Sequence, residues 1–303
     1  MAEDKPLVTV FGATGSQGTS VVKALMKSGK YRVRGVSRQD PNSEKLKPLR
    51  ELGAEPFQAD QKHKDQVVAA CKGAYAVYSV TDFYAIGPHE LEYGTTVAEG
   101  AKEAGVTHFV WSTLANVEEQ SGGKYEVPHF TDKATVDPVV RKQQFKYHTF
   151  VIPAWYYQNW SMFPGLVKTR PDGTVAFTVP LDENTRHTGY DVDDTGPAVL
   201  NILEHPEEWH DKHVPLAGYH APIKKWIEDF TKVTGKKAVL ERVPDDKAPN
   251  EEWAQMFAWF REFSYYGDFD ITVGRRAYPG MKDWPEWLRE SGWKGETPKS
   301  SEE

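Results

Sequence analysis

The sequence predicts an α/β protein built on a doubly wound parallel sheet. An apolar strand at residues 7–11 leads into a glycine turn, an amphipathic helix follows, and strand and helix patterns then alternate as far as residue 160. Parallel neighbouring strands need crossover helices, so this alternation gives a parallel sheet with helices on both faces. The 303 residues are enough for one large or two medium domains with a substantial core.

The glycine turn, GATGSQG, lies between the first strand and the first helix. Its G-x-x-G-x-x-G spacing departs from the common G-x-G-x-x-G fingerprint, so the surrounding strand, helix and strand carry the prediction. Glycine lets the backbone turn tightly and approach a phosphate, and the amide groups that begin the helix favour an anion. We therefore expect a Rossmann-type fold that binds a dinucleotide pyrophosphate. The expected contacts are Gly12, Ala13, Thr14, Gly15, Ser16, Gln17 and Gly18.

The end of the second strand, expected at residues 31–36, indicates which dinucleotide binds. Arg38 stands twenty residues after Gly18, where an NAD site usually has an acidic residue. An arginine accommodates the 2′-phosphate of NADP, so we expect NADP to be bound by Arg38 and the Ser37 hydroxyl. Two alternatives remain open. Asp40 would place a carboxylate near the ribose, and Arg38 could be a plain surface charge.

Later strands supply the remaining expected contacts, because ligands bind doubly wound sheets at the carboxyl ends of the strands. Strands are expected at residues 55–59, 74–80, 108–111 and 149–152. The residues expected to face the cofactor after these strands are Asp60, Gln61, Thr81, Asp82, Phe83, Ala154, Trp155, Tyr156, Tyr157 and Asn159.

Residues 1–160 are expected to form the NADP-binding domain, and residues 161–303 a smaller α+β domain for a substrate or partner. A segment near residues 185–205 is expected to pack back on the first domain. The polar tail, residues 294–303, is expected to be mobile.

Within the second half, a hairpin is predicted between Gly165 and Pro180, and helices at residues 195–204, at 223–234 and from about Asn250. The last helix places apolar residues at i, i+3, i+4 and i+7, which is more typical of a core than of a cofactor site. These residues are Trp253, Met256, Phe257 and Phe260.

Composition excludes several classes of function. A net charge of −7 argues against direct binding of nucleic acid, and no apolar run is long enough to cross a membrane. The start shows no secretory signal, and the single Cys71 cannot form an internal disulfide, so we expect a protein of the cytoplasm or nucleus. No metal site is expected, because the spacing of four nearby histidines fits no usual ligand pattern. These are His205, His210, His213 and His220.

Taken in order, these motifs resemble the NmrA-like family, a branch of the atypical short-chain dehydrogenases. The motifs that carry the resemblance are GATGSQG, Ser37-Arg38, Thr81-Asp82-Phe83, HFTDK at residues 129–133 and PAWYYQN at residues 153–159. The resemblance covers about residues 5 to 290 and implies NADP binding. In much of the family it implies a redox sensor that contacts a protein partner, often a transcriptional regulator, whereas isoflavone reductase-like relatives transfer hydride.

The HFTDK stretch bears on the chemistry. A standard short-chain dehydrogenase uses Tyr-x-x-x-Lys, whereas here His129 replaces the tyrosine and Lys133 remains. Either side chain could protonate a substrate, the lysine only if burial lowers its pKa. Alternatively, Lys133 only binds the nicotinamide ribose and His129 packs. A helix is expected from near Thr135, with Pro138 in its first turn, which would leave Lys133 in a loop.

Two functions follow from these observations. The first is an NADP(H)-binding redox sensor or regulator whose partner-binding surface changes with the cofactor, and the missing tyrosine favours it. The second is an NADPH-dependent reductase of a carbonyl, imine or enone, whose apolar or aromatic substrate stacks among Phe83, Trp155, Tyr156 and the aromatic residues of the C-terminal part. Either a monomer or a homodimer is compatible with the sequence.

Overall fold

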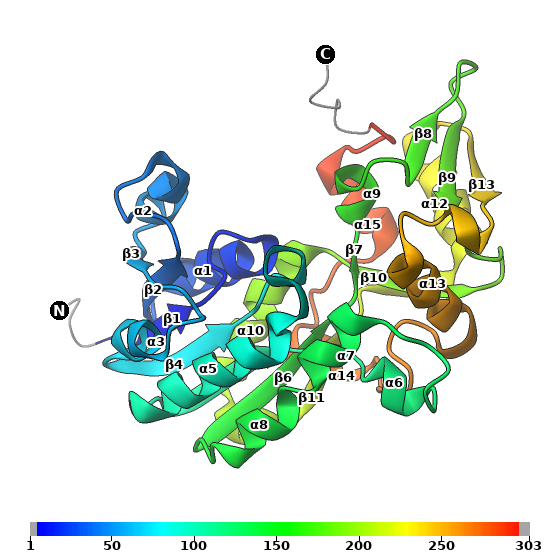
Figure 1. Ribbon diagram of the computed structural model, residues 1–303. Helices are drawn as coiled ribbons and strands as arrows, with labels where there is room; N and C mark the ends of the chain where they lie inside the picture. Colours follow the sequence, from blue (N-terminus) through cyan, green and yellow to red (C-terminus); the bar gives the residue numbers. More distant parts are fainter. Residues whose placement is uncertain (1–4, 297–303) are drawn as a thin grey trace.

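The centre of the computed structural model, which describes residues 5–296, is a seven-stranded parallel sheet (Figure 1). From one edge to the other, its strands are β11 (His213–Leu216), β6 (Tyr147–Pro153), β5 (His108–Ser112), β4 (Ala74–Ser79), β1 (Leu7–Val10), β2 (Arg32–Ser37) and β3 (Glu55–Gln58). Every neighbouring pair is parallel. The predicted fold class is therefore confirmed, and the chain order reverses between β1 and β4, the kind of position where such sheets bind ligands.

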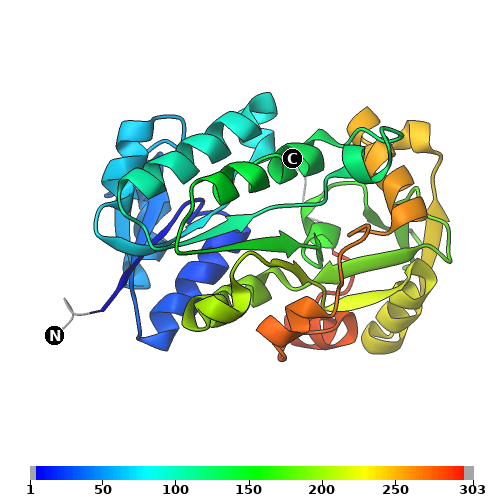
Figure 2. The ribbon, with the colours of Figure 1, turned by 90° about the horizontal axis from the view of Figure 1, so that it is seen from below.

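Both faces of the sheet are covered by helices, as Figures 1 and 2 show. The side chains of β1 alternate between two cores, with Val8 and Val10 in one and Leu7 in the other. One face is covered by α1 (Ser16–Ser28) and α10 (Thr195–Glu204), which pack against each other. The other is covered by α3 (Lys64–Cys71), α5 (Glu90–Glu103), α7 (Pro128–Ala134) and α8 (Asp137–Lys142).

The contact between α1 and α10 is close because Gly196 has no side chain. A Cβ at Gly196 would lie 2.1 Å from the Ser20 carbonyl oxygen. The Ser20 hydroxyl donates to the Asp193 carbonyl over 2.7 Å and accepts from the Gly196 amide over 2.9 Å. Beyond α10, the chain returns to the large sheet as β11. The domain boundary at residue 160 stays a prediction.

Two three-stranded sheets lie beyond the carboxyl edge of the large sheet (Figure 1). One contains β12 (Tyr219–Pro222), β10 (Arg186–Tyr190) and β7 (Trp155–Tyr156). The other contains β13 (Ala238–Arg242), β9 (Val175–Val179) and β8 (Val167–Thr169), and β8 and β9 form the predicted hairpin. Packed around them are α12 (Ile223–Thr234), α13 (Glu251–Phe263), α14 (Val273–Ala277) and α15 (Trp284–Ser291).

Short helices connect the larger elements. The α-helical ones are α2 (Lys47–Glu51), α4 (Phe83–Ile86), α6 (Val117–Gln120), α9 (Asn159–Met162) and α11 (Pro206–Trp209). The 3₁₀ turns are η1 (Glu44–Leu46), η2 (Gly87–His89), η3 (Val192–Asp194) and η4 (Asp245–Lys247).

The prediction that Lys133 lies in a loop was wrong. Pro138 does stand in the first turn of a helix, α8, but Pro128 begins a second helix immediately before it, α7. Proline is favoured at the start of a helix because its missing N–H is not needed there. Lys133 consequently lies in the last turn of α7 and is buried.

The stripe on α13 is core, as predicted, with Trp253, Met256, Phe257 and Phe260 all buried. The Cys71 thiol is also buried, and burial raises its pKa to about 12, which makes it unreactive. The predicted mobile tail lies outside the described residues from 297 onwards. No helix among residues 5–296 is long and apolar enough to span a membrane.

Candidate functional site

A cavity of about 840 Å³ lies at the carboxyl edge of the large sheet, opening where the strand order reverses. It brings together most of the site residues that the sequence predicts. Those that line it are Gly12, Thr14, Gly15, Ser16, Gln17, Gly18, Ser37, Arg38, Asp60, Gln61, Thr81, Asp82, Phe83, His129, Lys133, Ala154, Trp155, Tyr156 and Asn159.

Two of the predicted residues do not line the cavity. Ala13 is fully buried, with its side chain beside Gly35 in β2. Tyr157 follows Tyr156 on an extended segment, so its side chain points the other way. Its hydroxyl donates to the Lys282 carbonyl over 3.1 Å, and its ring packs on tryptophans of α12 and α15.

The sequence did not identify several residues of the far wall. Trp253 and Met256 were assigned to the core, and they are buried, but they also line the cavity. Both lie on α13, far along the chain from the glycine turn, and no short sequence motif links the two regions. Other lining residues that the sequence missed include Lys45, Tyr84, Tyr93, Leu114, Phe130, Met162, Phe163 and Tyr265.

The glycine turn forms a cradle at the start of α1. Gly12 has a φ of +69°, and a Cβ at Gly18 would lie 2.1 Å from the Gly12 carbonyl oxygen, so both positions require glycine. Gly15 differs. A Cβ there would meet only the Gly12 oxygen, at 3.4 Å, and would otherwise enter the cavity. Within the part of the chain that the structure describes, no side chain caps α1, so its first amides are available to an anion.

Gln17 fixes the first turn of α1 to the opposite wall. Its carbonyl oxygen accepts from the Tyr78 hydroxyl over 2.7 Å and from the Ser112 hydroxyl over 2.9 Å. Its amide donates to the Tyr156 hydroxyl over 2.7 Å. Burial raises the pKa of Tyr156, so this phenol holds its proton at neutral pH.

Beyond the cradle, the ends of β2 and β3 form a rim with basic side chains. Arg38 and Lys45 line the cavity, are exposed, and form no ion pair within residues 5–296. Asp40 does not line it; its carboxylate instead accepts from the Asn42 amide over 2.7 Å. We call the cradle together with Ser37, Arg38 and Lys45 the phosphate end.

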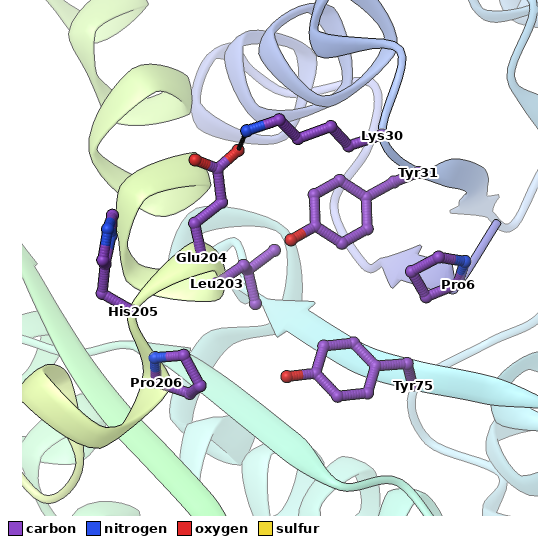
Figure 3. A pocket seen from close by; sticks show the side chains of 8 residues that line it. All are labelled: Pro6, Lys30, Tyr31, Tyr75, Leu203, Glu204, His205 and Pro206. Atoms are coloured by element: carbon purple, nitrogen blue, oxygen red, sulfur yellow. Dashed lines mark hydrogen bonds and ion pairs between the residues drawn. The ribbon is translucent and has the colours of Figure 1, made fainter.

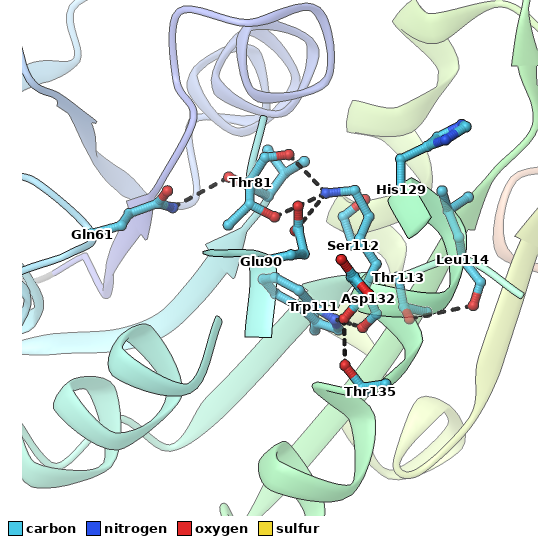
Figure 4. Close-up of polar contacts among 12 residues, drawn as sticks. Gln61, Thr81, Glu90, Trp111, Ser112, Thr113, Leu114, His129, Asp132 and Thr135 are labelled. Carbon is cyan, nitrogen blue, oxygen red and sulfur yellow. Dashed lines mark hydrogen bonds and ion pairs between the residues drawn. The ribbon is translucent and has the colours of Figure 1, made fainter. Parts of the chain in front are cut away.

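The amine of Lys133 is held on three sides. It donates to the Thr81 carbonyl and the Thr81 hydroxyl, each over 2.9 Å, and to Glu90 Oε1 over 2.6 Å. Figure 4 shows Thr81 and Glu90 side by side, and dashed lines mark these contacts. Since an ammonium group has three hydrogens, these contacts use them all.

Burial acts strongly on this pair. Glu90 is completely buried, and its second carboxyl oxygen has no partner within the described residues. Burial lowers the pKa of Lys133 and raises the pKa of Glu90, while the attraction between the two opposes both changes. Lys133 thus ties the end of β4 to the start of α5.

At the other end of the cavity is an aromatic chamber, which we define as Phe83, Tyr84, Trp155, Phe163, Trp253, Met256 and Tyr265. Trp253 packs edge-on against Phe163, with ring centroids 5.1 Å apart, and against Trp155 at 6.1 Å. Its indole N–H donates to the Tyr84 hydroxyl over 3.3 Å. The walls favour a flat apolar group.

His129, in the first turn of α7, stands at the edge of this chamber and contacts α13. Its backbone amide and its Nδ1 both contact Glu252 Oε1, over 2.9 and 2.6 Å. Its ring centroid is 5.9 Å from that of Phe83 and 6.0 Å from that of Tyr84. The predicted proton donors therefore differ in their surroundings, because Lys133 is enclosed whereas His129 borders the chamber.

A second hollow, of about 530 Å³, lies at the opposite edge of the sheet (Figure 3). Tyr31 and Tyr75, which stand at the amino ends of β2 and β4, share it with an ion pair of 2.7 Å between Lys30 and Glu204. Doubly wound sheets bind ligands at the carboxyl ends of their strands, so this hollow is not the site. No metal-binding cluster of three or more His, Cys, Asp or Glu occurs between residues 5 and 296.

The chain belongs to the NmrA-like family, whose model matches residues 4–288. It is 32% identical over 280 residues to an NmrA-like family domain-containing protein of Dictyostelium discoideum, covering 89% of this chain and 91% of the relative. It is 33% identical over 261 residues to an NmrA-like family domain-containing oxidoreductase, malD, of Malbranchea aurantiaca, covering 80% of this chain and 77% of the relative.

Solved structures show the same fold. The crystal structure of NmrA, a negative transcriptional regulator, in complex with NADP superposes with a TM-score of 0.81 at 24% identity, covering 94% of this chain and 95% of that one. The Citrobacter triphenylmethane reductase complexed with NADP(H) superposes with a TM-score of 0.72 at 18% identity, covering 94% and 99%. The fold is thus shared by a regulator and a reductase.

Proposed function

We propose that this chain is an NADPH-dependent reductase of flat, apolar carbonyl, imine or enone compounds. The observation that carries the proposal is the division of one cavity into a phosphate end and an aromatic chamber, with His129 beside the chamber. Relatives named as oxidoreductases, such as malD, support the assignment.

The phosphate end fits an adenine dinucleotide with a 2′-phosphate. The uncapped amides of α1 suit the pyrophosphate, and the space beside Gly15 admits it. Arg38 and Lys45 stand at the rim and pair with no carboxylate of residues 5–296, which suits the additional phosphate of NADP better than the bare ribose of NAD. When bound, the nicotinamide supplies the hydride.

Arg38→Ala is expected to weaken binding of NADP by about 1.5 to 3 kcal/mol, or about 10- to 150-fold, because a charge-assisted hydrogen bond is lost. Binding of NAD, which lacks the 2′-phosphate, is expected to change little. Isothermal titration with both dinucleotides measures the difference. Lys47→Ala is the control, because Lys47 pairs with Glu51 on the surface and does not line the cavity. Equal losses for NADP and NAD would refute the contact.

The reductase is tested with purified protein, NADPH and a panel of planar quinones, enones, cyclic imines and aromatic aldehydes. We expect substrate-dependent loss of NADPH absorbance, with the lowest KM for planar conjugated compounds. Trp253→Leu is expected to raise KM for these compounds without changing NADPH affinity, because it opens the chamber away from the phosphate end. No consumption of NADPH with any member of the panel would refute the reductase.

A redox sensor is the second candidate, and one observation favours it. Helix α13 touches the large-sheet part across the cavity mouth, through Glu252 to His129 and Trp253 to Tyr84. A ligand in the cavity would contact both sides and could change the outer surface of α13, provided that it binds the two arrangements with different affinity. Amide exchange of α13 that differs between NADPH and NADP⁺, without turnover, would support the sensor.

A further inference from the structure

Glu252 holds His129 in a single orientation. The same oxygen of Glu252 accepts from the His129 backbone amide over 2.9 Å and contacts His129 Nδ1 at 2.6 Å. Both side chains are largely buried, with 12% of His129 and 20% of Glu252 exposed. The two residues are 123 positions apart in sequence and come from α7 and α13. The contact is therefore made only when α13 is docked against the large-sheet part.

The contact also determines which ring nitrogen carries a hydrogen. Partial burial disfavours the charge of Glu252, but the hydrogen bonds from His129 outweigh it and lower the pKa of this carboxyl. An ionised carboxylate can only accept, so the hydrogen of the 2.6 Å contact belongs to Nδ1. Nε2, on the other edge of the ring, has no partner within residues 5–296 and is the nitrogen left for the cavity that His129 lines.

Lys133 has no hydrogen free to donate to a substrate in the observed arrangement. His129 and Lys133 are four residues apart on α7 and both line the cavity. The three hydrogens of the Lys133 amine, however, are already donated to Thr81 and Glu90. Donating to a substrate would require breaking a contact inside a buried pair, whereas Nε2 of His129 has no partner among the described residues.

The geometry points to His129 as the proton donor of the proposed reduction, with Glu252 as the residue that positions it. This inference rests on the proposed function. A reduced nicotinamide bound in the cavity would supply the hydride for a new C–H bond at the electrophilic carbon, and the C=O or C=N π electrons would move to the heteroatom. The heteroatom takes a proton from His129 Nε2. The hydrogen on Nδ1 stays on the ring and remains hydrogen-bonded to Glu252. Solvent then returns a proton to Nε2, so each turnover consumes one NADPH and one proton.

If Glu252 only stabilised α13, removing it would have the same effect as removing another acidic residue from the same turn. Acidic residues in the first turn of a helix interact favourably with its dipole, and α13 has both Glu251 and Glu252 there. Glu251 is exposed and accepts from Gln255 on the same helix over 3.0 Å. Glu251→Leu therefore removes the same charge from the same turn without touching His129. It is the matched control for Glu252→Leu.

The first experiment reads the tautomer of His129 without any ligand. Nitrogen–proton correlation spectra of the imidazole rings are recorded at the alkaline end of a pH series, where they no longer change with pH. The signals of His129 are assigned, among the ten histidines of the chain, by their loss in His129→Asn. We expect the Nδ1–H form in the wild type and in Glu251→Leu, and a shift to the Nε2–H form or a mixture in Glu252→Leu. An Nε2–H form in the wild type, or no change in Glu252→Leu, would overturn the pairing.

The second experiment uses a planar quinone, phenanthrenequinone, as the probe substrate with NADPH. His129→Asn is expected to lower kcat by about 100-fold or more, the usual contribution of a general acid. Glu252→Leu is expected to lower kcat at least tenfold, and Glu251→Leu less than twofold, with NADPH affinity unchanged in all three. Wild-type kcat in His129→Asn would overturn the donor assignment. If the wild type reduced no member of the panel, the proposed function and the donor role would both fail, while the tautomer spectra would still report on the Glu252 contact.

Discussion

Glu90→Leu is expected to lower the free energy of unfolding by about 3 to 5 kcal/mol, the usual cost of removing one partner of a buried ion pair. Glu90 is completely buried and lies 2.6 Å from the Lys133 amine. Without the carboxylate, this amine would remain enclosed with only Thr81 as its partner. Urea unfolding at pH 7 measures the loss. Glu92→Leu, two residues further along α5, removes an exposed carboxylate and is expected to change stability by less than about 0.5 kcal/mol.

The stability of Glu90→Leu is also expected to depend on pH. Burial lowers the pKa of Lys133 even beside Glu90, and loss of the carboxylate removes the main group that opposes this shift. The folded variant then binds fewer protons than the unfolded chain, so its free energy of unfolding rises with pH, up to about 10.4, the ordinary pKa of lysine. The double variant Glu90→Leu/Lys133→Met should recover most of the stability and lose the pH dependence. A single variant as stable as the wild type would refute the buried pair.

Gly15→Val is expected to weaken NADP and NAD equally, by about 100-fold or more, equivalent to about 2.7 kcal/mol. The backbone of Gly15, with φ −83° and ψ 171°, is open to any residue, so the substitution brings no strain. Its side chain would enter the space that we assign to the pyrophosphate. Calorimetric titration with both dinucleotides measures the loss, and an unchanged urea midpoint shows that the fold is intact.

Gly18→Ala provides the contrast to Gly15→Val. Its Cβ would lie 2.1 Å from the Gly12 carbonyl oxygen, so the substitution should destabilise the fold itself by about 3 kcal/mol or more. The two variants thereby separate loss of binding caused by misfolding from loss of binding caused by a side chain that fills the site. Unchanged dinucleotide affinity in folded Gly15→Val would place the phosphates elsewhere.

The sequence was most informative where a local pattern determines a local structure. The glycine turn, the strand ends and the helix at residues 195–204 follow from residue types within a few positions of one another, and the structure has them. The tandem helices α7 and α8 were missed because Pro128 begins one helix and Pro138 stands in the first turn of the next, and only the second was recognised.

The partners of the two candidate proton donors could not be predicted. Glu90 and Glu252 contact Lys133 and His129 across 43 and 123 residues of sequence. Each stands in the first turn of its helix, where a carboxylate is common for local reasons. Only the folded structure shows that one encloses a lysine and the other orients a histidine.

The position of β11 has a consequence for how the molecule must be assembled. Its residues, His213–Leu216, form the outer strand beside β6 and pair with Phe150 through Pro153. A polypeptide cut after residue 160 would leave β6 as an unpaired, apolar edge strand whose exposed hydrogen-bonding groups are a template for aggregation. Synthesis has to proceed past residue 216 before β11 can pair with β6. The dinucleotide-binding half is thus not expected to persist as an independent soluble fragment.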